Sequence, residues 1–228
     1  MFYDETITIN NCEQNPELIF LLIKEGYKDV IDKILSKKSF DINITDKDSN
    51  TVLMKLLKTG YFDLVVKHMK NKRWDVNHQN IDGDTFGHIL FSIKDSKIVE
   101  IVKLLMKNKT FSPNIRNNKG DTILDLSINN KSIYETAKIL ENKKFDSVGP
   151  LSFKRLFDTY IRTNKYGRYT KLSNLDMILD YLGKREVSPS VKEIINTIKE
   201  NYDEVKEEFI NNKTDKIDFI FKSVLSTV

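Results

Sequence analysis

Three histidines stand ten residues apart in the sequence, at His68, His78 and His88. Imidazole nitrogen is a common zinc ligand, so this spacing raises the question of a metal centre. A zinc site needs ligands that converge, and neither cysteine nor a repeated carboxylate accompanies these histidines. Apolar periodicity places His68 and His88 in two different helices and His78 in a loop. We therefore expect structural roles for the three histidines and no bound metal.

Residues that could support catalysis form no recognisable motif. Cys12, the single cysteine, lies in a polar segment with no histidine near it in sequence. The sequence contains no G-x-S-x-G, no phosphate-binding glycine loop and no H-E-x-x-H. Carboxylate pairs such as Asp46 and Asp48, or Glu207 and Glu208, are expected on solvated faces in a chain with 33 acidic residues. The sequence predicts a protein that is not an enzyme and needs no cofactor.

One stretch, residues 154–171, combines basic and aromatic side chains. It carries six basic residues and three tyrosines against one acid, Asp158. Lysine and arginine could contact phosphates while tyrosines stack on bases, as in proteins that bind single strands of nucleic acid. The same stretch could hold an acidic protein, or form a solvated loop with buried tyrosines. The residues of the nucleic-acid hypothesis are Lys154, Arg155, Arg162, Lys165, Tyr166, Arg168, Tyr169 and Lys171.

Composition narrows the choice of partner and compartment. The 228 residues carry a net charge of +4, which is too small by itself to indicate nucleic-acid binding. The longest apolar run, residues 18–23, is far shorter than the ~20 residues needed to span a bilayer, so no membrane partner is expected. The start of the sequence lacks the basic region of a secretory signal, and a single cysteine favours a reducing compartment. We expect an intracellular, cytoplasmic protein, with the nucleus as the alternative.

A repeat organises the first two thirds of the chain. Its start is marked by Asn43, Asn77 and Asn114, which are 34 and 37 positions apart. A threonine stands eight residues after each asparagine, and a turn residue stands two positions before each threonine. The threonines are Thr51, Thr85 and Thr122, and the turn residues are Ser49, Gly83 and Gly120. Because the asparagine, the turn residue and the threonine keep the same spacing in all three copies, we interpret the repeat as structural.

Each unit of the repeat is predicted to be a turn followed by two short helices, since apolar residues recur with helical spacing in two stretches after the threonine. Such short helices are marginal alone, but each unit can cover the apolar face of its neighbour, as in a solenoid. Gly26-Tyr27 stands 34 positions before Gly60-Tyr61, which indicates one more unit upstream. The predicted units are residues 15–40, 41–74, 75–111 and 112–146, and the repeats together occupy residues 1–146.

These residues resemble the ankyrin repeat family, whose pattern is roughly D-x-N-x-x-[DN]-x-x-G-x-T-P-L-H. The fullest copy has Asp75, Asn77, Asn80, Gly83, Thr85 and His88, and Glu100-Ile-Val-Lys-Leu-Leu105 is similar to the family's second helix. The family's proline is replaced in this chain by Val52, Phe86 and Ile123. The resemblance implies that the threonines cap the first helix of each unit, and that Gly83 and Gly120 take positive φ angles.

The resemblance also implies where a partner binds, because the family uses its hairpin tips and the exposed face of its first helices. Mapped onto this sequence, these positions are Lys47, Asp48, Asn50, Lys55, His78, Gln79, Ile81, Asp82, Asp84, Ile89, Arg116, Asn118 and Asp121. Ile81, Ile89 and Leu126 would be unusual on an inert face and are candidate anchors for a partner. The alternative is that they are scattered apolar surface residues or pack between repeats.

The repeat markers stop at Gly149-Pro150, and residues 147–228 are predicted to be helical. This region either caps the solenoid or forms a small helical domain, with one long helix after Ser188-Pro189 and a short helix around residues 217–225. Residues 172–182 are similar to the F-box-like segment of some viral ankyrin proteins, without its proline. Richness in Lys, Asn and Ile resembles proteins of AT-rich genomes, including large DNA viruses, for which the compartment would be the host cytoplasm.

The sequence therefore predicts an all-α fold: an ankyrin-repeat solenoid of about four repeats followed by a helical C-terminal region. The expected function is a non-enzymatic protein–protein interaction scaffold. Two alternatives stay open, namely a nucleic-acid-associated protein that uses residues 154–171 and an adaptor with an F-box-like C-terminal segment.

Overall fold

The computed structural model describes residues 11–12, 14–70, 74–130, 136, 138–140, 142, 150–157, 171–183, 187, 189–211, 213 and 215–225. Within these residues the chain forms helices and loops, and its strand-like pairing is limited to an isolated bridge between Thr45 and Thr51. The prediction of an all-α fold is confirmed. The chain divides into two compact units, unit 1 (Met1–Leu126) and unit 2 (Ser127–Val228). The division falls inside the predicted fourth repeat.

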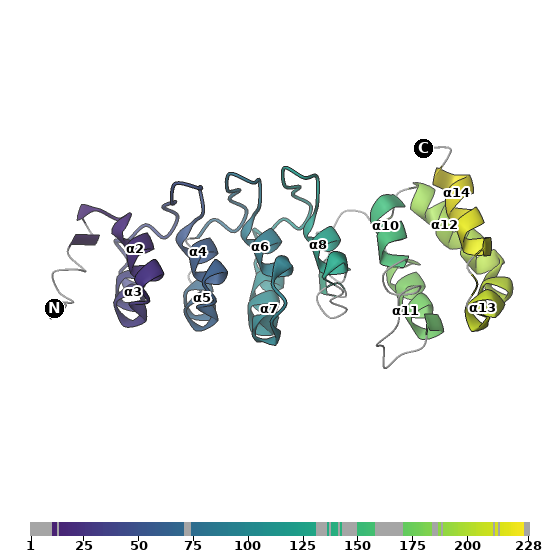
Figure 1. Ribbon diagram of the computed structural model, residues 1–228, viewed down its shortest axis with the longest axis horizontal. Coiled ribbons are helices and arrows are strands. Elements are labelled where there is room, and N and C mark those ends of the chain that lie inside the picture. The colour runs from purple at the N-terminus through teal and green to yellow at the C-terminus, as the bar shows by residue number, and fades with distance from the viewer. Residues whose placement is uncertain are drawn as a thin grey trace. The chain divides into compact units, whose positions relative to one another are not determined.

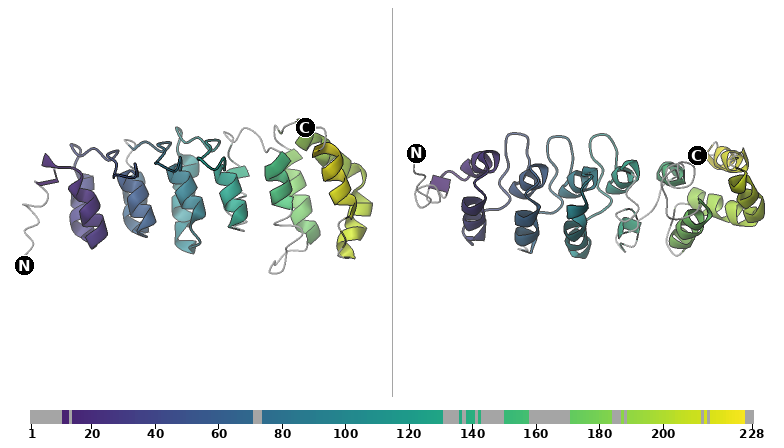
Figure 2. Two further views of the ribbon diagram at one scale, coloured as in Figure 1. Left: turned by 45° about the horizontal axis from the view of Figure 1, so that its top comes forward. Right: turned by 60° about the horizontal axis from the view of Figure 1, so that its bottom comes forward.

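Unit 1 is built from helix pairs that stand side by side (Figures 1 and 2). Its helices are α2 (Leu18–Glu25), α3 (Lys28–Ser36), α4 (Val52–Lys58), α5 (Phe62–Met69), α6 (Phe86–Ser92), the 3₁₀ turn η1 (Ser96–Ile98) and α7 (Val99–Lys107), and α8 (Ile123–Asn129) begins in this unit. In one layer α4 packs against both α2 and α6, and in the other layer α5 packs against both α3 and α7. The loops that join one pair to the next project to the same side (Figure 1).

A threonine begins the first helix after each of these loops. Thr51 Oγ1 accepts the N–H of Met54 and Thr85 Oγ1 accepts the N–H of His88, both at 3.4 Å. Thr122 Oγ1 accepts the N–H of Asp125 at the same distance. Each cap satisfies a backbone donor that the helix leaves unpaired, which is worth about 1 kcal/mol. The predicted threonine caps are confirmed, and they explain why helices of seven residues start where they do.

The core of unit 1 lies between its helix pairs and under the loops. Trp74 and Phe86 pack edge to face, with ring centroids 5.1 Å apart. Gly87 lets the core close around α6, because a Cβ there would lie 3.1 Å from Ile123 and 3.3 Å from Phe111. Further buried side chains include Ile19, Ile23, Ile31, Ile34, Leu53, Leu57, Val65, Leu90, Phe91, Ile101, Val102 and Leu105. The apolar stripes read from the sequence are therefore the surfaces that the stacked pairs bury.

A charged cluster joins two helices of the second layer. Asp32 on α3 accepts hydrogen bonds from Lys67 and from Nε2 of His68 on α5, the latter at 2.8 Å. The hydrogen bond from Lys67 is the largest influence on Asp32 and holds the pKa of its carboxyl below the usual value. Burial lowers the pKa of His68, and its bond to Asp32 opposes this effect. The cluster therefore links neighbouring repeats with a neutral histidine at neutral pH.

Unit 2 is a separate group of helices arranged around α12. Its helices include α10 (Pro150–Phe157), α11 (Lys171–Gly183), α12 (Pro189–Glu200), α13 (Tyr202–Ile210) and α14 (Asp215–Leu225). Helix α12 packs against α10, α11, α13 and α14, and Phe153 meets Phe221 with ring centroids 5.6 Å apart. The single long helix expected after Pro189 is wrong, because the chain turns at Asn201. There the backbone N–H and the side-chain Nδ2 of Asn201 both donate to the carbonyl of Thr197.

Candidate protein-binding surface

Three loops project from unit 1, and each is closed by the same set of hydrogen bonds. We name them loop 1 (residues 44–51), loop 2 (residues 78–85) and loop 3 (residues 115–122). In loop 2, Asn80 Oδ1 accepts the N–H groups of Asp82 and Asp84, and the Asn80 N–H donates to the carbonyl of Asp84. Asp46 makes the corresponding bonds in loop 1 and Asn117 makes them in loop 3. An Asx side chain that bonds its own turn fixes the loop shape locally.

Hydrogen bonds also join each loop to the next. The side-chain amide of Asn80 donates to Asn50 Oδ1 at 2.9 Å, and that of Asn117 donates to Asp84 at 2.8 Å. Further links run through the backbone, from the Ile81 N–H to Asp48 and from the Asn118 N–H to Asp82. The three loops therefore form one connected row, which we call the loop edge. A surface that is ordered before binding loses less conformational entropy when a partner arrives.

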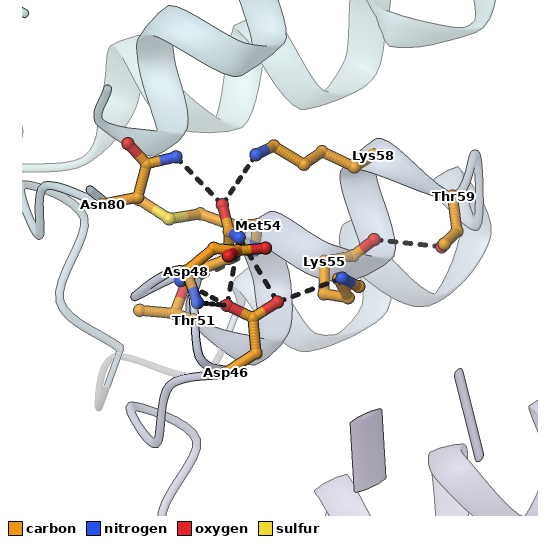
Figure 3. A network of polar contacts seen from close by, with 9 residues as sticks. Asp46, Asp48, Thr51, Met54, Lys55, Lys58, Thr59 and Asn80 are labelled. Carbon is orange, nitrogen blue, oxygen red and sulfur yellow. Dashed lines mark hydrogen bonds and ion pairs between the residues drawn. The ribbon is translucent and has the colours of Figure 1, made fainter. Parts of the chain in front are cut away.

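Loop 1 carries an acid, Asp46, where the other two loops carry asparagine (Figure 3). Its carboxylate accepts the loop N–H groups and also Lys55 Nζ at 3.0 Å. Burial would raise the pKa of Asp46, but the hydrogen bonds from Asn50 and Lys55 outweigh burial and lower it. Asn50 Oδ1 accepts both Lys58 Nζ and the amide of Asn80, which completes the link to loop 2. Asp46 is therefore an anion whose charge is compensated by the loop N–H groups and by Lys55 of α4.

The three histidines have separate partners. His68 binds Asp32, and His78 Nε2 lies 2.9 Å from the carbonyl of Ser49 in loop 1. His88 Nδ1 accepts the Thr85 N–H, so the neutral ring carries its proton on Nε2, which donates to the carbonyl of Asp121 at 3.0 Å. Among the residues that the structure describes, no group of three or more His, Cys, Asp and Glu side chains could hold a metal ion.

We expect the stability of unit 1 to fall when the pH is lowered from about 7.5 to about 5.5. Burial lowers the pKa of His88, although its bond to Asp121 opposes this, and burial also lowers the pKa of His68. A histidine with a lower pKa in the folded state is protonated more readily in the unfolded chain, so acid favours unfolding below the unfolded pKa of about 6.5. Urea unfolding followed by the fluorescence of Trp74 at both pH values measures the effect.

The variant His88→Gln tests whether His88 contributes to this pH dependence. Glutamine at this third helical position can still accept the N–H of Thr85, as in a capping box, but it does not titrate. The variant should therefore lose less stability than the wild type over the same pH interval, whatever its stability at pH 7.5. An equal loss in both proteins would show that His88 does not contribute to the pH dependence.

The candidate binding residues divide into three groups by exposure. Those exposed on the loop edge are Lys47, Gln79, Ile81, Asp82, Arg116 and Asn118. Those half-buried are Asp48, Lys55, His78, Asp84 and Asp121. Two others, Asn50 and Ile89, are buried. The expectation that Asn50 and Ile89 offer their side chains to a partner is therefore wrong.

Both corrections have a packing reason. Asn50 is buried because its amide bonds Asp46 in its own loop and its Oδ1 accepts from loop 2. Ile89 lies on α6, which packs against α4 on one side and has Ile123 against Gly87. In a helix of seven residues covered in this way, every residue from Phe86 to Phe91 is buried. Leu126, the third candidate anchor, is half-buried, so Ile81 is the expected anchor that remains exposed.

Sequence reasoning missed a groove beside loop 1. The groove has a volume of about 640 Å³ and is lined by Glu17, Phe20, Leu21, Lys24, Thr45, Asp46, Lys47 and Lys55. Residues 18–23 form one apolar run, which by itself suggests that all six side chains are buried. Helical spacing within the run could have indicated the groove, because only Ile19, Leu22 and Ile23 lie on the buried face of α2. Leu21 falls outside that face and is 53% exposed.

The described residues of the two alternative sites belong to unit 2. Lys154 and Arg155 occupy the last turn of α10, and Lys171 begins α11. Five residues of the nucleic-acid hypothesis lie outside the described residues, namely Arg162, Lys165, Tyr166, Arg168 and Tyr169. The F-box-like segment lies in α11, where Leu175, Ile178, Leu179 and Leu182 are buried. This apolar stripe is therefore part of the core of unit 2.

In comparisons with known proteins, no protein-family model matches the chain, and no curated protein matches it. Among the helices that the structure describes, none combines the length and apolar character required to cross a bilayer.

Proposed function

We propose that this chain is a non-enzymatic protein-binding scaffold. In this proposal residues 1–146 form an ankyrin-like solenoid, and one protein partner docks on the loop edge. The recurring Asx turns, threonine caps and stacked helix pairs of unit 1 support the resemblance to the family. His88, which joins Thr85 to the next loop, adds to this support.

The observation that carries the proposal is the exposure of Ile81 on an ordered loop. Its side chain is 65% exposed, while its backbone N–H and carbonyl are held by Asp48 and by the amide of Asn118. A large apolar side chain fixed at the middle of a projecting edge can enter a pocket of a partner at small entropic cost. Lys47, Asp82 and Arg116 around it carry both signs of charge, which suits a protein surface better than a polyanion.

Ile81→Asp is expected to weaken partner binding by about tenfold or more, because it removes the apolar anchor and adds a charge that would be buried. The partner is first captured by affinity purification from cells that make the protein and identified by quantitative mass spectrometry. Its affinity for the wild type and the variant is then measured by titration with the purified partner. Arg116→Glu, which reverses one exposed charge of loop 3, should also weaken binding.

Ile210→Asp is the matched control. Ile210 is 64% exposed at the end of α13 in unit 2, so it has the same residue type and exposure without belonging to the loop edge. If Ile81→Asp and Arg116→Glu bind the partner as tightly as the wild type does, the loop edge is not the docking surface. Trp74 fluorescence confirms that unit 1 of each variant is folded.

A further inference from the structure

The groove beside loop 1 has an apolar floor open to solvent. Phe20 is half-buried and Leu21 is exposed, and both lie on α2, with loop 1 forming the opposite wall through Thr45, Asp46 and Lys47. A volume of about 640 Å³ is within the range of sites that hold ligands, so the groove can take several side chains of an extended or helical segment. Exposed apolar surface in a concave site of this kind favours a ligand with an apolar side chain.

The groove is lined by more cationic than anionic side chains. Asp46 is compensated by Lys55 at 3.0 Å and by the loop N–H groups, which leaves neither of these two side chains available to a ligand charge. Lys24 and Lys47 are exposed at the groove, and neither has an ion-pair partner among the residues that the structure describes. Glu17, at the start of α2, is the one lining carboxylate that remains against these two cations.

The position of these charges gives the groove a direction. Glu17, Leu21 and Lys24 follow one another at helical spacing along one face of α2, so the carboxylate lies at one end of the face and the ammonium at the other. Lys47 adds the second cation from loop 1. We propose that this groove binds a segment of the protein partner in which a bulky apolar residue has acidic residues as neighbours. The apolar side chain contacts Phe20 and Leu21, and the carboxylates pair with Lys24 and Lys47.

This inference rests on the proposed protein-binding function and makes it more specific. The loop edge provides Ile81 as an anchor for the partner. The groove beside loop 1 favours a partner segment that carries both apolar and acidic residues. Charge pairs at the rim of an interface act mainly on specificity and association rate, while the apolar contact supplies most of the affinity. The segment should therefore bind more weakly as the salt concentration rises.

The test uses the full chain and a phage-displayed library of random dodecapeptides as the probe. We expect the enriched peptides to combine Leu, Ile or Phe with neighbouring Asp or Glu. A synthetic, fluorescein-labelled copy of the most enriched peptide is then titrated with each variant by fluorescence polarisation. Lys24→Gln with Lys47→Gln should weaken its binding about tenfold, and Leu21→Asp should weaken it at least as much.

Lys103→Gln is the matched control, since Lys103 is exposed on α7 and does not line the groove. It should leave the dissociation constant of the peptide unchanged. Enrichment of basic peptides, the absence of any enriched peptide, or equal binding by the groove variants and the wild type would each overturn the inference. A concentration-dependent dimer that Leu21→Asp dissolves would assign the groove to a second copy of the chain and would overturn it as well.

The two proposals fail in different ways. If the captured partner loses affinity for Ile81→Asp but not for the Lys24→Gln and Lys47→Gln variant, the loop edge is the docking surface and the groove inference is wrong. If no captured protein responds to any of these variants, the proposed function itself is wrong.

Discussion

Replacing Gly83 with alanine is expected to destabilise unit 1 by about 3 kcal/mol. Gly83 has a φ of +73°, a left-handed conformation that costs a residue with a side chain about 1–2 kcal/mol. An added Cβ would also lie 2.5 Å from Asn118 Oδ1 and 2.7 Å from the Asn118 backbone nitrogen. Loop 3 must therefore move away from loop 2, which costs about 1–3 kcal/mol more. Urea unfolding monitored by Trp74 fluorescence measures the total.

Gly120→Ala separates the two contributions. Gly120 has nearly the same φ, +78°, at the corresponding position of loop 3, but an added Cβ would meet nothing within 4 Å. Its substitution should cost only the backbone term, about 1.5 kcal/mol. If both variants lose the same stability, the close approach of loops 2 and 3 contributes nothing, and the loop edge is less tightly connected than its hydrogen bonds indicate.

These two glycines show what the sequence could and could not predict. Their positions relative to the threonines identified both turns, and the resemblance to the ankyrin family implied both positive φ angles, which the structure has. The steric difference between Gly83 and Gly120 was not predictable, since it depends on which loop packs against each of them.

The candidate site was less predictable than the fold for the same reason. Asn50 is polar and lies at a loop tip, which favours exposure, yet the turn directs its Oδ1 toward Asn80 of loop 2. Ile89 was placed on an exposed helix face by its position in the repeat, yet neighbouring packing covers all of α6 through Phe91. The groove has apolar surface open to solvent because Leu21 is exposed, and this exposure depends on the arrangement of α2 beside loop 1. Local patterns thus located the loops, while neighbouring loops and helices decided which side chains they expose.

The residues that follow the three capping threonines have a role in packing. Val52, Phe86 and Ile123 each occupy the first position of a helix, where proline would be favourable. All three are buried, so each adds apolar surface to the core. Phe86 also joins the second repeat to the third, because its ring meets Trp74 edge to face.

Phe86→Ala is accordingly expected to destabilise unit 1 by about 4 kcal/mol, through lost burial and the cavity left beside Trp74. The phenyl group is 1% exposed, and its centroid lies 5.1 Å from that of the indole. Trp74 is the chain's single tryptophan, so its fluorescence reports unfolding of unit 1 directly and its folded-state emission should also shift. Ile81→Ala is the control, because Ile81 lies in the same unit, is 65% exposed, and its truncation should change stability by less than about 0.5 kcal/mol. Similar losses in the two variants would mean that the Trp74–Phe86 contact does not hold neighbouring repeats together.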